Sequence, residues 1–314
     1  MKRNLNYLLS LFVSILLALL LGALIMIGSG YSPLEGYGAL LSGALGSTRG
    51  IGNTLYKSAQ LMITGLATAV AAQSGIFNVG GEGQMYLGAL ASAWIGALLT
   101  GVSPFLAIPA CLLASVIAGS LYALIPAVLK VKLKINEVIT TILMNSIAIY
   151  FTTYMANGPL KTTEKGVAAG TASLDEAFRF SKVIRGSNLT ESVFYIAVIT
   201  LIVWYLMSRT TVGYRMKLTG QNPRFARYIG LHAERLAIAG MLISGAMCGM
   251  LGMFETFGLQ TRFKADFSNE FYFDGMLVAM IMRYKPMGII LMSFFFGILK
   301  MGAQTMQAKT GISS

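Results

Sequence analysis

The stretch SGIFNVGGEGQMYLG, residues 74–88, places polar side chains and glycines inside a long apolar part of the chain. A glycine costs a helix about 1 kcal/mol relative to alanine, and a carboxylate at bilayer depth costs roughly 3 kcal/mol on insertion scales. Two explanations remain open: a helix break that exposes backbone groups to a solute, or close packing of helices through small residues. The polar side chains favour the first, because packing needs none of them. The residues that could line a path for a solute are Phe77, Asn78, Gly80, Gly81, Glu82 and Gln84.

Catalytic motifs are missing from the sequence. It contains no GxxxxGK[ST], HExxH, CxxC or GxSxG pattern, and His232 is its only histidine. The chain therefore has no P-loop of its own and no histidine-based metal cluster. We interpret Glu82, Glu137 and Asp274 as the acids at or near hydrocarbon depth, each close to the end of an apolar segment. This scarcity argues against an intramembrane enzyme and against a cation-coupled transporter, both of which need ionisable groups in mid-membrane.

The composition defines the elements that must position these residues. The 314 residues are 55% hydrophobic and 11% charged, with a mean hydropathy of +0.69. A soluble domain carries about 25% charged residues, so this chain has too few to cover a water-facing surface. The fold class is therefore all-α: a polytopic transmembrane helical bundle, with residues 1–314 as one domain. The apolar segments lie at 5–27, 51–73, 84–101, 104–128, 137–157, 191–208, 235–254, 271–282 and 287–306.

Lysines and arginines crowd alternate connections of this bundle. The positive-inside rule assigns the N-terminus and the loops 129–136, 209–234 and 283–286 to the cytoplasm, and residues 158–190 become a long outer loop. The net charge of +12 is mostly this cytoplasmic excess, which argues against nucleic-acid binding. Nine crossings leave the C-terminal tail on the outer side, so we expect about ten spans in the complete form, with the last helix missing.

Cys111 and Cys248 lie in separate apolar segments. We interpret both as small core residues, and a disulfide between them is the less favoured alternative.

Two of the basic loops contain helix signals. In KVKLKINEVITTILMNSIAIY, residues 130–150, Asn136 is placed as an N-cap with Glu137 in the first turn. In YRMKLTGQNPRFARYIGLHAERL, residues 214–236, Asn222 and Pro223 can begin a short helix that Gly230 closes. On physical grounds alone, an anchor on anionic lipid explains the second loop slightly better than a protein-binding site.

At these motifs the chain resembles the permeases of bacterial ABC importers, in the family shared by branched-chain amino acid and simple-sugar systems. Within that family it is most similar to permeases of nucleoside uptake systems that work with a basic-membrane-protein-type lipoprotein. The resemblance rests on SGIFNVGGEGQMYLGA, KLKINEVITTILMN, GQNPRFARYIG and FDGMLVAMIMRYKPMGII, in the family's order between residues 55 and 305. Phe225 and Ala226 stand where two alanines are usual, Leu231 replaces the common isoleucine, and RYKPMG departs from the usual asparagine-rich version.

The resemblance implies a non-catalytic transmembrane subunit in the bacterial cytoplasmic membrane, with a cytoplasmic N-terminus and no cofactor of its own. A separate ATPase binds ATP, a second homologous permease completes the pathway, and an extracytoplasmic lipoprotein delivers the solute. Transport then follows alternating access. The resemblance places ATPase coupling in the 209–234 loop, at Gly220, Asn222, Pro223, Phe225, Ala226 and Gly230.

For a nucleoside, Phe77 could stack on the base, and Asn78 or Gln84 could bind ribose hydroxyls. Simple sugars and branched-chain amino acids are the alternative solutes. A cation-coupled secondary transporter is the alternative class.

Overall fold

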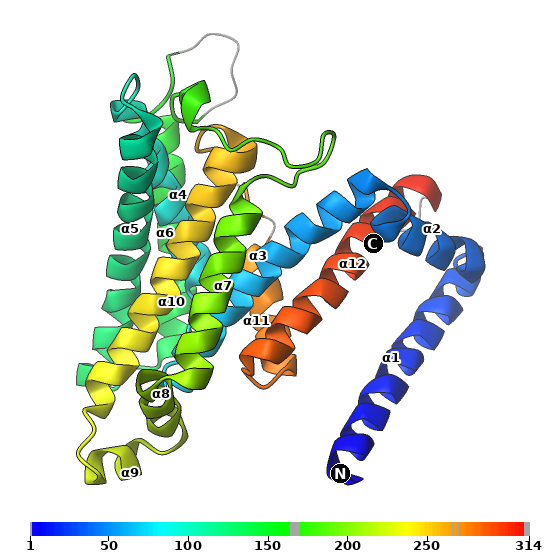
Figure 1. Cartoon of the computed structure of the whole chain (residues 1–314), viewed down its shortest axis with the longest axis horizontal. Helices are drawn as coiled ribbons and strands as arrows, with labels where there is room; N and C mark the ends of the chain where they lie inside the picture. The colour runs from blue at the N-terminus through cyan, green and yellow to red at the C-terminus, as the bar shows by residue number, and fades with distance from the viewer. Residues whose placement is uncertain (1, 164–169, 266, 269, 311–314) are drawn as a thin grey trace.

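The computed structural model describes residues 2–163, 170–265, 267, 268 and 270–310, which form a bundle of α-helices (Figure 1). Their bounds are α1 (Lys2–Gly28), α2 (Pro33–Leu45), α3 (Thr48–Gln73), α4 (Gly81–Leu98), α5 (Pro104–Leu133), α6 (Glu137–Asn157), α7 (Ser192–Arg209), α8 (Thr211–Gln221), α9 (Pro223–Tyr228), α10 (Ala233–Glu255), α11 (Phe271–Ile281) and α12 (Pro286–Thr310). A 3₁₀ turn, η1 (Glu176–Phe178), lies in the segment before α7, and a π-helical turn, η2 (Thr256–Gln260), extends α10. The all-α class predicted from composition is confirmed.

Nine of these helices match the nine apolar segments, with ends that differ by a few residues: α1, α3, α4, α5, α6, α7, α10, α11 and α12. Five are long and apolar enough to cross a membrane by length and composition, namely α5, α6, α7, α10 with η2, and α12. Helix α2 has no counterpart among the apolar segments and lies in a stretch expected to be a connection. Ser32 caps this helix by accepting a hydrogen bond from the Glu35 N–H, and Pro33 occupies its first turn.

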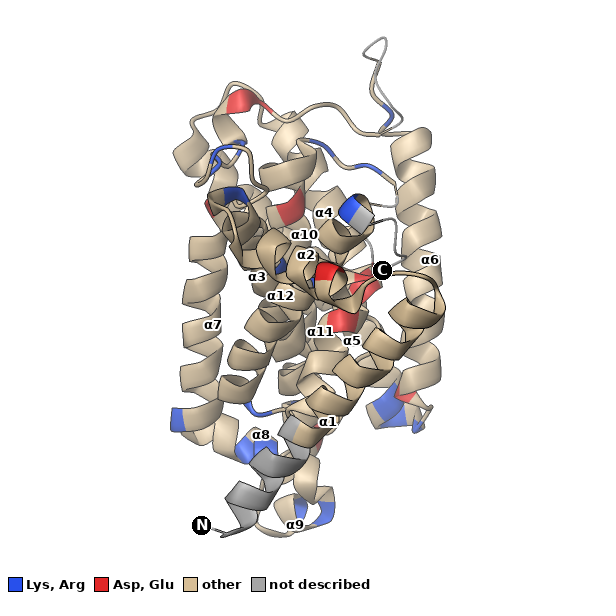
Figure 2. Ribbon diagram, turned by 90° about the vertical axis from the view of Figure 1, so that its right-hand side faces the viewer, with Lys and Arg blue, Asp and Glu red and all other residues tan. Residues whose placement is uncertain are grey.

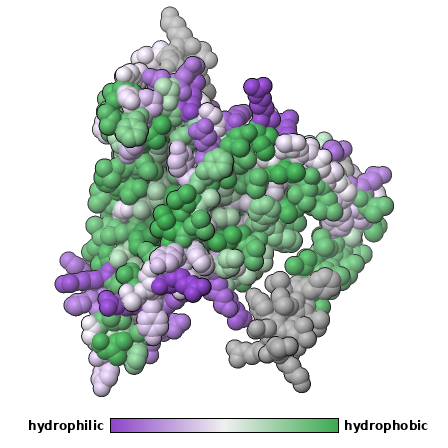
Figure 3. All heavy atoms as spheres, viewed as in Figure 1, coloured by the Kyte–Doolittle hydropathy of each residue, from purple (hydrophilic) through white to green (hydrophobic). Residues whose placement is uncertain are grey.

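The polar surface gathers at the two ends of the bundle. The start of α1, the α5–α6 connection, α8 and α9 lie at the lower end of Figure 1, and the segment between α6 and α7 lies at the upper end. A predominantly apolar band separates these ends on the face shown in Figure 3. The basic connections that the sequence analysis grouped on one side therefore do lie at the same end of the molecule.

The centre of the bundle is built on α10, which packs against α3, α4 and α5. Glycines allow this close approach: a Cβ on Gly88 of α4 would overlap the backbone of Gly249 on α10, and a Cβ on Gly119 of α5 would overlap Gly245. Cys111 and Cys248 are buried here as free thiols, as predicted. On the other side of α3, α11 and α12 pack against it and complete the interior.

Candidate functional site

The glycine-rich stretch forms a true break between α3 and α4. Helix α3 ends at Gln73, Gly75 has a positive φ of 97°, and α4 begins only at Gly81. The chain between them has no regular structure, so its peptide groups need partners from elsewhere in the molecule. The break predicted from the sequence at this place is confirmed.

Side chains of α6 supply several of those partners. The amide of Asn145 donates a hydrogen bond to the Val79 carbonyl (2.8 Å) and accepts one from the Gly83 N–H (2.8 Å). The hydroxyl of Thr141 accepts a hydrogen bond from the Val79 N–H (3.3 Å). Helix α6 therefore stabilises both the break and the first turn of α4.

Asn78 is fully buried and uses both ends of its side-chain amide. Its NH₂ group donates to the Gln84 side-chain oxygen and to the Ser244 hydroxyl, both at 2.9 Å, and its oxygen accepts the Gly80 N–H at 2.9 Å. The Tyr272 hydroxyl donates to the Asn78 carbonyl at 2.6 Å. In this conformation the side chains of Asn78 and Gln84 hydrogen-bond to protein groups and do not face an open space.

Glu82 connects two helices that both begin inside the bundle. It lies in the first turn of α4, is 5% exposed, and accepts hydrogen bonds from the Ser268 hydroxyl and from the Tyr272 N–H (3.1 Å) at the start of α11. The carboxylate thus satisfies an N–H at the start of α11, where the helix dipole also favours a negative charge.

The remaining candidate pathway residues differ in their surroundings. A Cβ on Gly81 would overlap the Tyr272 ring, and a Cβ on Gly80 would lie 3.1 Å from the Thr141 Cβ, so both glycines permit close contact. Phe77 is partly exposed. Of the six candidates, it is the one whose side chain a solute could reach without rearrangement.

The basic loop at the lower end folds as α8 and α9. The Asn222 side chain caps α9 by accepting the Phe225 N–H at 3.0 Å, and Gly230 follows the helix with a φ of 82°, as the sequence predicted. Asn222, Pro223, Phe225 and Gly230 are exposed, whereas Ala226 is fully buried.

Gly220 contacts the helix that leads into the break. It lies in the last turn of α8, and a Cβ there would overlap the Gln73 carbonyl at the end of α3. Gly75 lies against the same glycine: a Cβ added to Gly75 would be 3.5 Å from the Gly220 Cα. Gln73 also donates from its side chain to the Tyr284 carbonyl in the α11–α12 connection. The two stretches singled out from the sequence therefore meet at the end of α3.

A second group of polar residues was missed. Glu255, which is not among the three acids predicted at or near hydrocarbon depth, lies at the end of α10 with 3% exposure. It accepts hydrogen bonds from the Tyr56 hydroxyl and from the Gln60 amide, both at 2.6 Å. Its burial corrects the earlier interpretation of which acids reach the interior. Neither the search for acids in the apolar segments nor the helix-end signals indicated its partners on α3. The available signal was that Tyr56 and Gln60 are spaced by one helical turn.

Lys57, Asp274 and Lys300 extend this group toward a cavity. Lys300 of α12 forms an ion pair with Asp274 in the first turn of α11, and the Lys57 ammonium lies 5.0 Å from the centre of the Phe271 ring. The cavity between α3, α11 and α12 has a volume of about 300 Å³. Its lining residues are Lys57, Gln60, Leu61, Phe271, Asp274, Lys300, Ala303 and Gln304. Figure 2 shows charged segments of both signs near these helices, away from the two charged ends.

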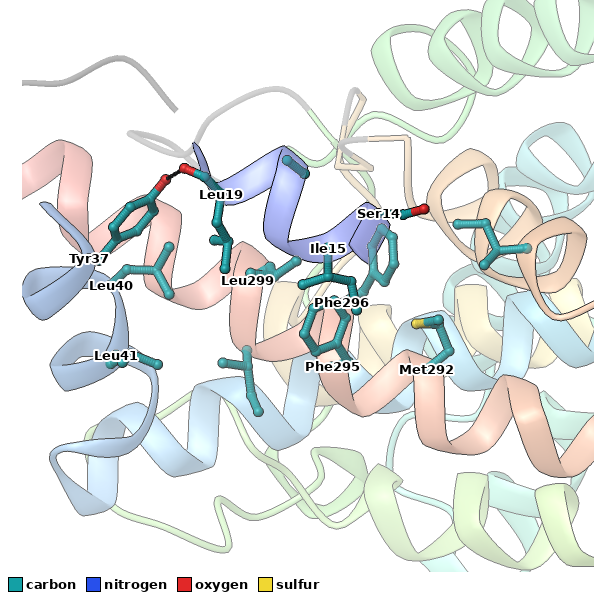
Figure 4. A pocket seen from close by; sticks show the side chains of 13 residues that line it. Ser14, Ile15, Leu19, Tyr37, Leu40, Leu41, Met292, Phe295, Phe296 and Leu299 are labelled. Carbon is teal, nitrogen blue, oxygen red and sulfur yellow. Dashed lines mark hydrogen bonds between the residues drawn. The ribbon is translucent and has the colours of Figure 1, made fainter. Parts of the chain in front are cut away.

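A larger cavity, of about 610 Å³, has a different chemical character. It lies between α1, α2 and α12, and its lining is almost entirely aliphatic and aromatic, including Leu19, Leu40 and Phe295 (Figure 4). The Tyr37 hydroxyl, at its edge, donates to the Leu19 carbonyl. This cavity has no set of polar groups that would orient a polar solute.

Comparison with known proteins decides the family. The family described as "Branched-chain amino acid transport system / permease component" matches residues 50–312. The chain belongs to this permease family. The match includes the break, α8, α9 and the polar cavity.

Three relatives of the permease are similar over most of their length. The guanosine ABC transporter permease protein NupP of Bacillus subtilis (strain 168) is 33% identical, over 100% of this chain and 90% of the relative. The nucleoside ABC transporter permease protein NupB of Lactococcus lactis subsp. cremoris is 32% identical, over 94% and 83%. The glucose ABC transporter permease protein TsgB13 of Haloferax volcanii is 28% identical, over 96% and 81%. No solved structure matches the permease.

The family and the apolar helices make the permease a membrane-integral protein. Both findings also agree with the family resemblance that was inferred from the four sequence motifs.

Proposed function

We propose that the permease is the transmembrane subunit of an ATP-driven importer of nucleosides. The observation that carries this proposal is the similarity, at 33% and 32% identity over nearly the whole chain, to permeases named for guanosine and nucleoside transport. The relative named for glucose is less similar, at 28%, which makes a simple sugar the second candidate solute.

The importer needs partners that this chain does not supply. Because the sequence has no P-loop, ATP is bound and hydrolysed by a separate cytoplasmic ATPase. A second homologous permease forms the other half of the pathway, and an extracytoplasmic lipoprotein delivers the nucleoside. The N-terminus and α9 face the cytoplasm, since the lysines and arginines gather at that end.

The exposed face of α9 is the proposed docking site for the ATPase. Phe225 and Tyr228 are 47% and 90% exposed there, while the buried Ala226 holds the helix on the bundle. Aromatic side chains of this kind are typical anchors of protein interfaces. Gly220 transmits a movement of α8 to the end of α3, and from there to residues 74–80.

The break then acts as the closed constriction of the pathway. The Ser244 side chain of α10 holds Asn78, the Tyr272 N–H of α11 binds Glu82, and Asn145 of α6 holds the neighbouring Gly83 N–H, so Asn78 and Glu82 meet a solute only when those helices separate. Phe77, Asn78, Gly80, Gly81, Glu82 and Gln84 line the pathway in that opened state. Alternating access supplies the separation when the ATPase subunits close.

The test is uptake by the reconstituted importer. Proteoliposomes are prepared with the permease, its ATPase, the second permease and the lipoprotein. They should accumulate radiolabelled guanosine only when ATP is present on the side of the membrane that carries the ATPase. Uptake should persist when a protonophore collapses the proton gradient. Guanosine uptake driven by a proton or sodium gradient, in vesicles that lack the ATPase, would contradict the proposal.

A further inference from the structure

The cavity between α3, α11 and α12 lies part-way along α3 and α12. Lys300 is about 20 Å along α12 from its start, within a hydrocarbon layer about 30 Å thick, and its neighbours Leu299 and Met301 are apolar. Lys57 lies about 14 Å from the start of α3, which runs in the opposite direction. Both lysines therefore reach the cavity at membrane depth.

Charged side chains at this depth are not shielded by burial alone. The side chains of Lys300 and Asp274 are 38% and 22% exposed. In hydrocarbon such exposure costs roughly 3 kcal/mol per charge on insertion scales, so charged residues of transmembrane helices face the protein interior or a water-filled space. On this ground we expect the partly polar cavity to hold water rather than to face lipid.

The lining has the chemistry of a site for an uncharged, hydroxyl-bearing solute. The lining contributes two lysines and one acid, Lys57, Lys300 and Asp274, and the buried Glu255 lies behind it, close enough to Lys57 to interact with its charge. The formal charges of these four residues sum to zero, so the group does not select strongly for a charged solute. Lysines donate hydrogen bonds and a carboxylate accepts them, which together satisfy both functions of neighbouring hydroxyl groups. Exposed Gln304 adds an amide that can do both.

Helix α11 gives the site a fixed geometry. It begins inside the bundle at Phe271, and Glu82 and Ser268 hold its first turn. Asp274 lies in that first turn, so its carboxylate is positioned by the same hydrogen bonds that stabilise the break. Sites on discontinuous helices at membrane depth are a recurring arrangement in transporters.

We propose that this cavity is a binding site for the sugar of the transported solute, with Asp274 accepting hydrogen bonds from the vicinal hydroxyls of a ribose and Lys57 donating to them. The inference rests on the proposed nucleoside import. It moves the first contact with the sugar from Asn78 and Gln84, which bind each other in this conformation, to the cavity beside α11.

The water-filled character is tested by cysteine labelling of the assembled importer. Ala303→Cys places a thiol in the polar cavity, and Ile298→Cys, on the same helix, places one in the apolar cavity. The native thiols Cys111 and Cys248 are buried. A membrane-impermeant methanethiosulfonate should modify Ala303→Cys much faster than Ile298→Cys, because thiolates form and react in water, and guanosine should slow that reaction. Equal, slow labelling of both would overturn the proposal.

Recognition of the hydroxyls is tested by solute preference. Asp274→Asn should lower uptake of guanosine by about tenfold or more, while uptake of 2′,3′-dideoxyguanosine stays within about twofold of wild type, because the analogue lacks the hydroxyls in question. Both solutes are supplied at concentrations that saturate the lipoprotein. Lys309→Gln, which removes an exposed charge elsewhere on α12, should change neither rate. An equal loss for both solutes would assign Asp274 a structural role only and overturn the site.

The two proposals fail in different ways. If the wild-type importer accumulates no nucleoside with ATP present, the proposed substrate is wrong, and the labelling result still decides whether the cavity holds water. If nucleosides are accumulated but Asp274→Asn preserves the preference for guanosine, the import stands and the sugar site does not.

Discussion

Individual polar residues are accommodated in the apolar interior of this permease by specific partners. Asn78 donates to Gln84 and Ser244, and Glu82 accepts from Ser268 and Tyr272. A buried polar group without a partner costs about 1–3 kcal/mol, so these hydrogen bonds are required for the break to exist. The polar residue types in the break are therefore explained by the hydrogen bonds that hold the break together as much as by contact with a solute.

Replacement of Glu82 separates its hydrogen bonding from its charge. Glu82→Gln keeps an oxygen that can accept the Tyr272 N–H, so the melting temperature of the purified permease should change by no more than a few degrees. Glu82→Leu removes both acceptors and should destabilise the permease by about 1–3 kcal/mol, through the unpaired N–H of α11. The stability of both variants is measured by thermal unfolding, monitored as the loss of the monodisperse peak on heating. A glutamine variant as unstable as the leucine variant would show that the charge itself is needed.

At the scale of the element, α4 and the shorter α11 both start inside the bundle, and their first turns contact each other. Glu82 in the first turn of α4 binds the start of α11, and Tyr272 of α11 binds the break before α4. Moving either helix therefore disturbs the other. Because Gly220 of α8 lies on the end of α3, which runs into this break, α8 has a direct path to it.

Variants of α8 and α9 distinguish docking of the ATPase from transmission of its movement. Phe225→Ala should reduce co-purification of the ATPase, because it removes an exposed aromatic side chain from the proposed interface. Gly220→Val should leave co-purification intact yet lower ATP-dependent uptake at least about tenfold, since its side chain would displace α8 from the Gln73 carbonyl. Tyr214→Ala, which removes an exposed aromatic from α8, is the control. Normal binding and full transport by both variants would instead favour a lipid anchor.

Local signals in the sequence predicted elements well, and distant contacts escaped it. The caps at Asn136 and Asn222 act on N–H groups two or three residues away, so their residue types alone indicated where α6 and α9 begin. The Glu255 carboxylate meets Tyr56 and Gln60 across 199 and 195 residues, and no local pattern encodes that pairing. The polar cavity was missed for this reason. Whether the six predicted pathway residues contact a solute stays a prediction, because that contact needs a different conformation.

At the scale of the whole molecule, charge and hydropathy organise the bundle into a polar end, an apolar band and a second polar end (Figures 2 and 3). The basic connections share one end, as the pattern of lysines and arginines predicted. We therefore expect the net charge of +12 to reflect the orientation of the permease in the membrane.

Orientation is tested with single thiols at the two ends. Arg224→Cys, on α9, should react with a membrane-impermeant maleimide only after the cells are lysed. Arg185→Cys, in the segment before α7, should react while the cytoplasmic membrane is still intact, once the reagent has been given access to its outer face. Both positions are exposed, so access to the reagent is limited by the membrane alone. The opposite pattern of labelling would invert the topology.

The hydrogen bond between Glu82 and the start of α11 joins residues 190 positions apart in the chain. At typical synthesis rates of 5–20 residues per second, α11 leaves the ribosome roughly 10–40 s after α4. Throughout that interval the nascent chain holds the Glu82 carboxylate and the Asn78 carbonyl without their partners from Tyr272. The interior of the permease is therefore completed only after α11 has been synthesised, and we expect α4 to stay with the insertion machinery until then.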